Sequence, residues 1–248
     1  MIFVEPTPDY VTRPDGVRLA YRYVAGTGPA IVFLPGYMSD MQGGKAQALT
    51  AWAQQEGRAM LRLDYSGCGE SGGRIDDGTL EIWRDDVLRV IDHLGLAAVI
   101  LVGSSMGGWL MLLVAGRLGN SLKGLVGIAA APDFTDWGFS DTEKSELLAQ
   151  GFVERPSGYG YDPMVTTRKF WQSGEANKQL GREIPIGCPV RLLHGQRDPD
   201  VPWEISLKLA QQLRSSDVQT ILLKDGDHRL SRNEDIALLI EVVAKLPV

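Results

Sequence analysis

The chain has 248 residues, of which 44% are hydrophobic and 23% are charged. This composition is typical of a globular protein, and α/β folds of this length often form a single core. The net charge is −6, and no dense basic run occurs. A nucleic-acid partner is therefore excluded, because such binding depends on basic side chains that displace counterions from phosphate.

Two cysteines, Cys68 and Cys188, stand far apart in the sequence. They form no disulfide framework and are typical of a reducing compartment. The opening residues MIFVEPTPDYVTRPDG lack the basic and apolar regions of a signal peptide. The apolar stretches are interrupted before the roughly 20 residues that a membrane span needs. We therefore expect a cytoplasmic protein without stable membrane insertion.

Short apolar runs rich in β-branched residues alternate with longer stretches of helical spacing. Strands are predicted at residues 17–24, 30–34, 59–63, 98–103, 122–130, 190–194 and 219–223. Helices are predicted at residues 45–55, 79–94, 106–118, 205–213 and 235–246. This alternation predicts an α/β fold with a mostly parallel central sheet flanked by helices on both faces.

One long segment, 133–187, breaks the alternation because it contains no clear strand but many aromatic and charged residues. It is too long for a simple connection between two strands. We interpret it as a cap inserted into a core formed by residues 1–132 and 188–248. Its residues Trp137, Phe139 and Trp171 are candidates for contact with an apolar acyl group, although aromatic residues more often pack a cap onto its core.

Two adjacent serines, Ser104 and Ser105, occur in the stretch VILVGSSMGGWL. The pattern G-x-S-x-G fits when Ser105 is central, between Gly103 and Gly107. In such a nucleophile elbow a strand turns sharply into a helix, and the flanking glycines pass close to neighbouring backbone. A predicted strand precedes Ser105 and a predicted helix follows it. Ser105 is therefore the candidate nucleophile, and Ser104 is interpreted as a packing residue.

A serine hydroxyl needs a base to take its proton and a carboxylate to orient that base. The chain has three histidines. His93 lies within a predicted helix, and His194 ends a predicted strand, where a structural role in a turn is expected. His228 follows the last predicted strand, at the sheet edge where catalytic groups of parallel sheets gather. We therefore predict His228 as the base.

The carboxylate should lie between serine and histidine in chain order. Asp198 follows the predicted strand 190–194 at the same sheet edge and is the favoured candidate. Asp200, two residues later, and Asp133, after the preceding strand, are its rivals.

The negative charge that develops on the substrate oxygen needs donors. The backbone N–H of the residue after the nucleophile, Met106, is one candidate. The second is the backbone N–H of Tyr37, in the loop FLPGYMS after an earlier strand.

Other motifs carry less weight. The sequence GCGESG (67–72) matches G-x-G-x-x-G, but GGRIDDG follows where a dinucleotide site needs an opening helix. The sequence GYMSDMQGGK departs from a phosphate-binding loop, since Ser39 stands at the first glycine position. Three scattered histidines support no zinc site. We expect no cofactor and no metal.

The motifs LPGY, DYSGCGESGG, GSSMGG, HGQRDPDVP and DGDH occur in this order over most of the chain. Together they resemble the α/β-hydrolase superfamily. The longer stretches FLPGYMSDMQGGKA, LEIWRDDVLRVID, ILVGSSMGGWLML and CPVRLLHGQRDPDVPW are similar to the mitochondrial abhydrolase type of acyl-protein thioesterase (palmitoyl-protein hydrolase) and acyl-glucuronide esterase. The resemblance implies an α/β-hydrolase fold with Ser105, Asp198 and His228 as its triad. The targeting peptide of that family has no counterpart here, so we expect a bacterial-type relative.

The expected activity is cofactor-independent hydrolysis of carboxylic esters or thioesters, on small molecules or on S-acylated proteins and peptides. A serine nucleophile argues against haloalkane dehalogenase and epoxide hydrolase chemistry, which use aspartate at that position in this fold. Two alternatives stay open. The same triad could cleave a carbon–carbon bond or a lactone, or the chain could be a ligand receptor of slow turnover built on the hydrolase fold.

Overall fold

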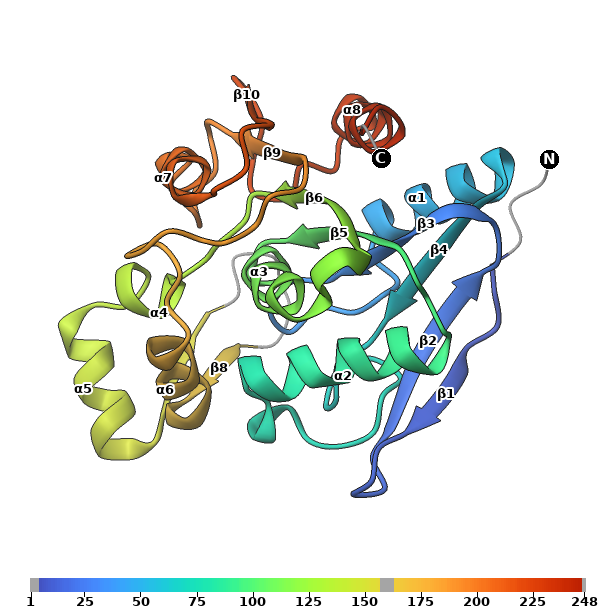
Figure 1. The fold of residues 1–248 in the computed structure, drawn as a ribbon. Helices are drawn as coiled ribbons and strands as arrows, with labels where there is room; N and C mark the ends of the chain where they lie inside the picture. The colour runs from blue at the N-terminus through green and yellow to red at the C-terminus, as the bar shows by residue number, and fades with distance from the viewer. Residues whose placement is uncertain (1–4, 157–162, 247–248) are drawn as a thin grey trace.

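A computed structural model describes residues 5–156 and 163–246, whose strands form an eight-stranded sheet and a two-stranded sheet (Figure 1). The large sheet has the order β1-β2-β4-β3-β5-β6-β9-β10. Its strands are β1 (Asp9–Thr12), β2 (Arg18–Val24), β3 (Thr27–Leu34), β4 (Arg58–Leu63), β5 (Val99–Ser104), β6 (Leu122–Ile128), β9 (Val190–Gly195) and β10 (Val218–Leu223). Pairs that involve β1 or β2 are antiparallel, and the rest are parallel. The predicted α/β class with a mostly parallel sheet is confirmed.

The central strands are hydrophobic along their whole length because both faces of the sheet are covered. In β5, Val99 and Leu101 belong to the hydrophobic cluster on one face of the sheet. The intervening residues Ile100 and Val102 belong to the cluster on the other face. Successive side chains of a strand point to opposite faces, so a continuous apolar run fills both layers.

Helices cover the two faces in separate sets, as the alternating pattern predicts. On one face, α1 (Gly44–Glu56) and α8 (Asn233–Ala244) contribute buried residues such as Leu49 and Leu239. On the other face lie α2 (Leu80–His93), α3 (Met106–Leu118) and α7 (Glu204–Gln212). Two short 3-10 helices, η1 (Ile75–Asp77) and η2 (Gly119–Ser121), lie in connecting loops.

The segment 133–187 lies between β6 and β9 and has its own elements. They are α4 (Phe134–Trp137), α5 (Asp141–Gln150), β7 (Phe152–Arg155), β8 (Met164–Thr167) and α6 (Arg168–Ala176). The expectation of no clear strand here is wrong, since β7 and β8 pair in an antiparallel ribbon. Each strand has only four residues, which is too short for an alternating pattern to stand out from the sequence.

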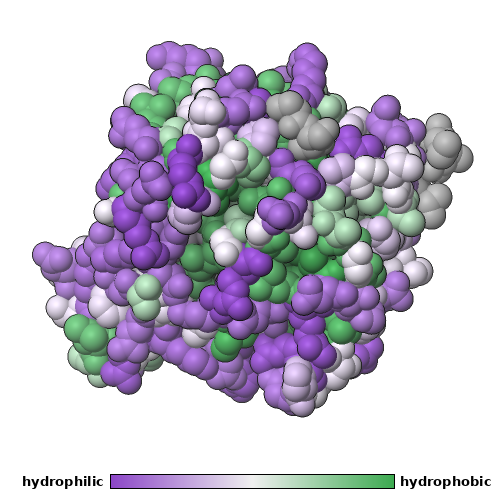
Figure 2. All heavy atoms as spheres, in the orientation of Figure 1, coloured by the Kyte–Doolittle hydropathy of each residue, from purple (hydrophilic) through white to green (hydrophobic). Residues whose placement is uncertain are grey.

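Aromatic rings join this segment to the core. Phe170 of α6 lies 4.7 Å from the ring of Tyr37 and 5.4 Å from that of Trp83, measured between ring centroids. Phe134 of α4 lies 5.6 Å from Trp109 of α3. In Figure 1, α4, α6 and β8 lie at the end toward which the arrows of β5 and β6 point. Hydrophobic residues gather in the middle of this view of the surface, within a mostly hydrophilic margin (Figure 2).

Among the described residues, no helix has the length and apolar character that crossing a membrane requires.

Candidate active site

Ser105 lies at the turn between β5 and α3 in an unusual backbone conformation, with φ 55° and ψ −121°. A positive φ is strained for a residue with a Cβ and persists only where the surroundings enforce it. Here the carbonyl oxygen of Ser105 accepts from the backbone N–H of Gly108 and of Ala131, over 2.8 and 3.0 Å. The turn therefore holds the serine side chain at the carboxyl end of the sheet.

Glycine is required on both sides of this turn. A Cβ built on Gly103 would lie 2.4 Å from the backbone oxygen of Gly107. A Cβ on Gly107 would lie 2.2 Å from the backbone oxygen of Leu34, at the end of β3. Real Cβ atoms do not approach backbone oxygens so closely. The G-x-S-x-G spacing is thus explained by the close approach of three backbone segments.

The structure brings Ser105, His228 and Asp198 together, although they are far apart in sequence. The Nε2 atom of His228 lies 3.1 Å from the Oγ of Ser105. The Nδ1 atom of the same ring lies 2.8 Å from the Oδ2 of Asp198. Asp198 follows β9 and His228 follows β10, so adjacent parallel strands deliver both side chains to one edge of the sheet. Both distances are those of hydrogen bonds.

The Asp198 carboxylate is held by four donors and its side chain has no exposed surface. Its Oδ1 accepts from the backbone N–H of Asp200 and of Val201, each over 2.8 Å. Its Oδ2 faces His228 and also His194, whose Nε2 lies 3.2 Å away. Burial alone would raise the pKa of Asp198, but the hydrogen bonds from the two histidines outweigh it and hold that pKa well below the usual range. The carboxylate is therefore ionised at neutral pH.

His194 is fully buried, and its contact with Asp198 was missed by sequence reasoning, which gave this residue only a structural role in a turn. The remaining ring contacts of His194 are to Ser206 Oγ and to the carbonyl oxygen of Val201. A signal was present in the sequence: His194 ends the predicted strand 190–194, only four positions before Asp198.

The rival residues have other positions. Asp200 is exposed, and its backbone N–H donates to the carboxylate of Asp198. The buried carboxylate of Asp133 accepts from the backbone N–H of Gln179 and of Leu180, over 2.7 and 2.8 Å. Burial raises the pKa of Asp133. Asp133 therefore links the start of the 133–187 segment to residues 179 and 180, and the carboxylate that contacts His228 is that of Asp198.

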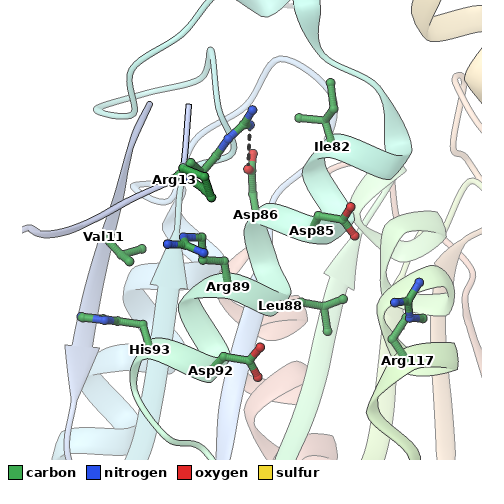
Figure 3. Close-up of a pocket in the computed structure, with 11 residues that line it drawn as sticks. Val11, Arg13, Ile82, Asp85, Asp86, Leu88, Arg89, Asp92, His93 and Arg117 are labelled. Carbon is green, nitrogen blue, oxygen red and sulfur yellow. Dashed lines mark hydrogen bonds and ion pairs between the residues drawn. The ribbon is translucent and has the colours of Figure 1, made fainter. Parts of the chain in front are cut away.

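The third histidine, His93, lies at the end of α2, where its ring is edge-on to Tyr21 at 6.0 Å. It lines a surface hollow of about 680 Å³ between β1 and α2 (Figure 3). Charges of both signs meet in this hollow, and Arg13 pairs with Asp86 over 3.0 Å. None of the residues that line it belongs to the candidate site.

The loop after β3 passes next to Ser105. A Cβ on Gly36 would lie 3.5 Å from the Cβ of Ser105, in ordinary van der Waals contact. Tyr37 is the next residue, and Met106 is the first residue of α3, where helix N–H groups have no partner within the helix. The two expected oxyanion donors therefore belong to backbone on either side of the serine.

The three aromatic candidates of the 133–187 segment have different surroundings. The indole N–H of Trp137 donates to Pro132 O, and that of Trp171 donates to Thr135 O. Both side chains are half-buried. Phe139 is 6% exposed, in a hydrophobic cluster with Leu147 and Val153. Phe139 thus packs within the segment itself.

Two other sequence features are accounted for by the structure. The glycine-rich stretch 67–72 wraps around the buried Asp64, which accepts from the backbone N–H of Met41 and of Glu70. A Cβ on Gly69 would lie 2.2 Å from the Asp64 carboxylate, so the glycine serves the turn. In the described part of the chain, Asp198, Asp200 and His228 form a group with metal-ligand spacing. The Nδ1 atom of His228 is already hydrogen-bonded to the Oδ2 of Asp198, so we assign the group no metal.

Residues 29–159, more than half of the chain, match the family described as alpha/beta hydrolase fold. The strained elbow, the sheet order and this match agree, and the chain belongs to the α/β-hydrolase family.

Particular relatives are similar over nearly the whole chain. The human palmitoyl-protein thioesterase ABHD10, mitochondrial, is 40% identical over 241 residues, which cover 96% of this chain and 79% of that protein. The crystal structure of a putative hydrolase from Agrobacterium vitis S4 has a TM-score of 0.91 and 38% identity, covering 97% of this chain and 98% of that one. Alpha/beta hydrolase domain-containing protein 10 from mouse has a TM-score of 0.90 and 39% identity, with the same coverage.

Proposed function

We propose that this protein is a serine hydrolase that cleaves carboxylic esters or thioesters through an acyl-enzyme, with Ser105, His228 and Asp198 as catalytic residues. The observation that carries the proposal is the continuous hydrogen-bond chain from Ser105 Oγ through both His228 nitrogens to Asp198. Ser105 stands at the start of this chain, in a backbone turn with a positive φ of 55°. The similarity to a protein named a palmitoyl-protein thioesterase supports an acyl group as the part of the substrate that is transferred.

In the first half of the reaction, His228 Nε2 takes the proton of Ser105 as Oγ attacks the acyl carbonyl carbon. The imidazolium that forms donates from Nδ1 to the ionised Asp198. Collapse of the tetrahedral intermediate breaks the bond to the alkoxide or thiolate, which leaves with a proton from His228 if it needs one. A thiolate needs less help, because the pKa of a thiol is about 8.5. Water activated by His228 then hydrolyses the acyl-enzyme.

The backbone N–H groups of Tyr37 and Met106 are proposed as the oxyanion donors. Their support is positional. Gly36 brings the first loop into contact with the serine, and Met106 begins α3 directly after it. Donors of this kind are preorganised and cost no rearrangement as charge develops on the oxygen.

We propose that residues 133–187 form a cap over the core of 1–132 and 188–248, and that its aromatic residues contact the acyl group. Support comes from the rings of Phe134 and Phe170, which both lie against the ring of Tyr37, and Phe134 also contacts that of Trp109. Trp137 and Trp171 remain candidates because they are half-buried. Phe139 contributes through the packing of the cap, since its ring lies under the Arg155 guanidinium at 4.2 Å.

A cytoplasmic location also stays part of the proposal. Cys68 and Cys188 are both free thiols, which fits a reducing compartment. The human relative carries the word mitochondrial in its name. Fractionation of cells that express the chain, with detection in the cytosolic fraction, tests this point.

The test of the activity is a matched panel of p-nitrophenyl esters and acyl thioesters from about two to sixteen carbons, with the Ser105→Ala protein as blank. Turnover that depends on Ser105, with thioesters competitive at medium or long chains, supports the deacylase form of the proposal. Fast cleavage of short esters alone makes the protein a small-ester carboxylesterase. Tight binding without turnover favours a receptor, and turnover of lactones or carbon–carbon substrates alone favours the other hydrolase chemistry.

A further inference from the structure

The Oδ2 atom of Asp198 faces two imidazole rings. His228 Nδ1 lies 2.8 Å from it, and His194 Nε2 lies 3.2 Å from it. The mechanism proposed above uses the first of these contacts and gives no role to the second. His194 is completely buried, and burying a polar ring is costly unless its nitrogens are satisfied. The second contact therefore calls for an explanation.

The partners of His194 determine which ring nitrogen carries the proton. Its Nε2 also lies 3.1 Å from the carbonyl oxygen of Val201, which has no hydrogen to donate. Nε2 must therefore carry the hydrogen, which it shares between Val201 O and Asp198 Oδ2. In the neutral ring, Nδ1 then accepts from the hydroxyl of Ser206, 2.7 Å away. The ring is thus fixed in orientation and in tautomer from both sides.

Without His194, the two oxygens of Asp198 would be held unequally. Oδ1 has two backbone donors, at Asp200 and Val201. Oδ2 would have His228 alone, and His228 is the group whose charge changes during catalysis. A donor that does not move, fixed by Ser206 behind it, keeps Oδ2 in line with His228 Nδ1 while the proton is on Ser105 and after it has moved.

We propose that His194 is a positioning residue of the active site, acting through Asp198 on His228. The inference rests on the proposed function. It assigns His194 no contact with substrate: its Nε2–H holds the carboxylate oxygen that orients the base. Because this oxygen acts during proton transfer, loss of the donor lowers kcat and leaves substrate binding, and so KM, unchanged.

Three variants and one control test the proposal in the whole chain of residues 1–248. His194→Phe keeps a planar ring and removes the donor, whereas His194→Gln keeps an N–H in the region of Nε2. Ser206→Ala removes the partner of Nδ1 and is a small change in case the Phe variant does not fold. Leu193→Ala, in the same strand, is the matched control, because the side chain of Leu193 is buried in the cluster on the opposite face and does not reach Asp198.

The measurements are kcat and KM on the preferred acyl substrate, with each kcat divided by the fraction of Ser105 that a fluorophosphonate probe titrates. A hydrogen bond of this kind is expected to change the rate about two- to tenfold. We expect His194→Phe to lower kcat per titrated serine by about that factor at constant KM. In His194→Gln, kcat per titrated serine should stay within about twofold of that of the parent. Ser206→Ala should lower it by a smaller factor than His194→Phe does. Leu193→Ala should lose thermal stability while keeping kcat per titrated serine.

The inference is overturned if His194→Phe or, where that variant does not fold, Ser206→Ala matches the parent in kcat per titrated serine and loses only thermal stability. It is also overturned if His194→Gln and His194→Phe lose the same activity. Failure of the proposed function looks different, because then the parent itself neither turns over the panel nor reacts with the probe at Ser105.

Discussion

The hydroxyl of Tyr37 donates a hydrogen bond to the backbone carbonyl oxygen of Val165, over 3.0 Å. Tyr37 lies in the loop after β3, beside Ser105, and Val165 lies in β8 of the 133–187 segment. The backbone of the same tyrosine is the proposed oxyanion donor. The loop proposed to stabilise the reacting oxygen is therefore tied directly to the segment proposed as the cap. Burial raises the pKa of Tyr37 to about 12, so the hydroxyl keeps its proton through the neutral range.

We expect Tyr37→Phe to weaken this connection while preserving the ring contact with Phe170. Loss of one buried hydrogen bond corresponds to about 1 kcal/mol, or roughly fivefold in rate. The decrease in kcat/KM should be larger for long acyl chains than for acetate, because in the proposed function long chains also contact the cap. Steady-state kinetics over the ester panel measure this, and equal losses at all chain lengths would contradict it.

The two adjacent serines should differ sharply. Ser105→Ala is expected to leave the fold intact and to abolish turnover, on the order of a 10⁶-fold loss, because a nucleophile has no substitute. Ser104→Ala should retain activity, since Ser104 ends β5 with its backbone paired to Ile128. Circular dichroism checks the fold and the ester panel checks turnover. Comparable activity in the Ser105→Ala protein would disprove the assignment.

Three aspartates allow a matched comparison. Asp198→Asn should lower kcat by about 10³- to 10⁴-fold, because the base loses its orienting carboxylate. Asp200→Asn should change kcat little, since Asp200 contributes its backbone N–H to the site. Asp133→Asn should keep kcat, but its free energy of unfolding should fall by about 1–3 kcal/mol, because one of two buried acceptors becomes a donor. Steady-state kinetics measure the effects on kcat, and urea unfolding measures the effects on stability. A large loss of kcat in Asp200→Asn would assign the orienting role to Asp200 and not to Asp198.

Glycines within α3 test the geometry of the elbow. Gly107→Ala places a Cβ against Leu34 O and is expected to destabilise the fold by more than about 1 kcal/mol and to remove activity. Gly116→Ala, in the same helix, meets open space and should stabilise the protein by about 0.5–1 kcal/mol. Thermal melts of both variants measure the contrast. Equal stability of the two proteins would show that the close approach at Gly107 is absent.

The proposed cap contains a pH-dependent ion pair between Glu143 and Arg155, 2.6 Å apart. Hydrogen bonds from Arg155 lower the pKa of Glu143 to about 2. A folded-state pKa below the unfolded value means that the stabilisation is present above pH 4.5 and is lost as the pH falls from there through about 2. Both side chains are partly exposed, so solvent limits the contribution to less than about 1 kcal/mol.

We therefore expect Glu143→Gln to melt at a lower temperature than the parent at pH 7, with the difference vanishing toward pH 2. Glutamine retains an oxygen that accepts from the backbone N–H of Ser140, but its amide nitrogen replaces the oxygen that accepts from Arg155 Nε, so the variant removes the charge together with one acceptor. If the difference in melting temperature does not depend on pH, the stabilisation comes from packing and the prediction for the ion pair is wrong.

The sheet and the elbow could be predicted from the sequence because their signals are local. A continuous apolar run such as that of β5 reports burial on both faces, and Gly103 and Gly107 report close backbone approach at fixed spacing from Ser105. The strands β7 and β8 could not be predicted, because a strand of only four residues gives too little periodicity to be recognised.

The sequence by itself determined the α/β class and the residue types at the ends of β5, β9 and β10, since these depend on short-range patterns. Only the tertiary structure decided which of those residues meet. In the structure, the Oδ2 atom of Asp198 contacts both His228 and His194. Asp133 instead accepts a hydrogen bond from the backbone of Gln179, within the 133–187 segment. These contacts depend on the register between neighbouring strands and on the path of the loops that follow them, and both are fixed by packing across the whole core.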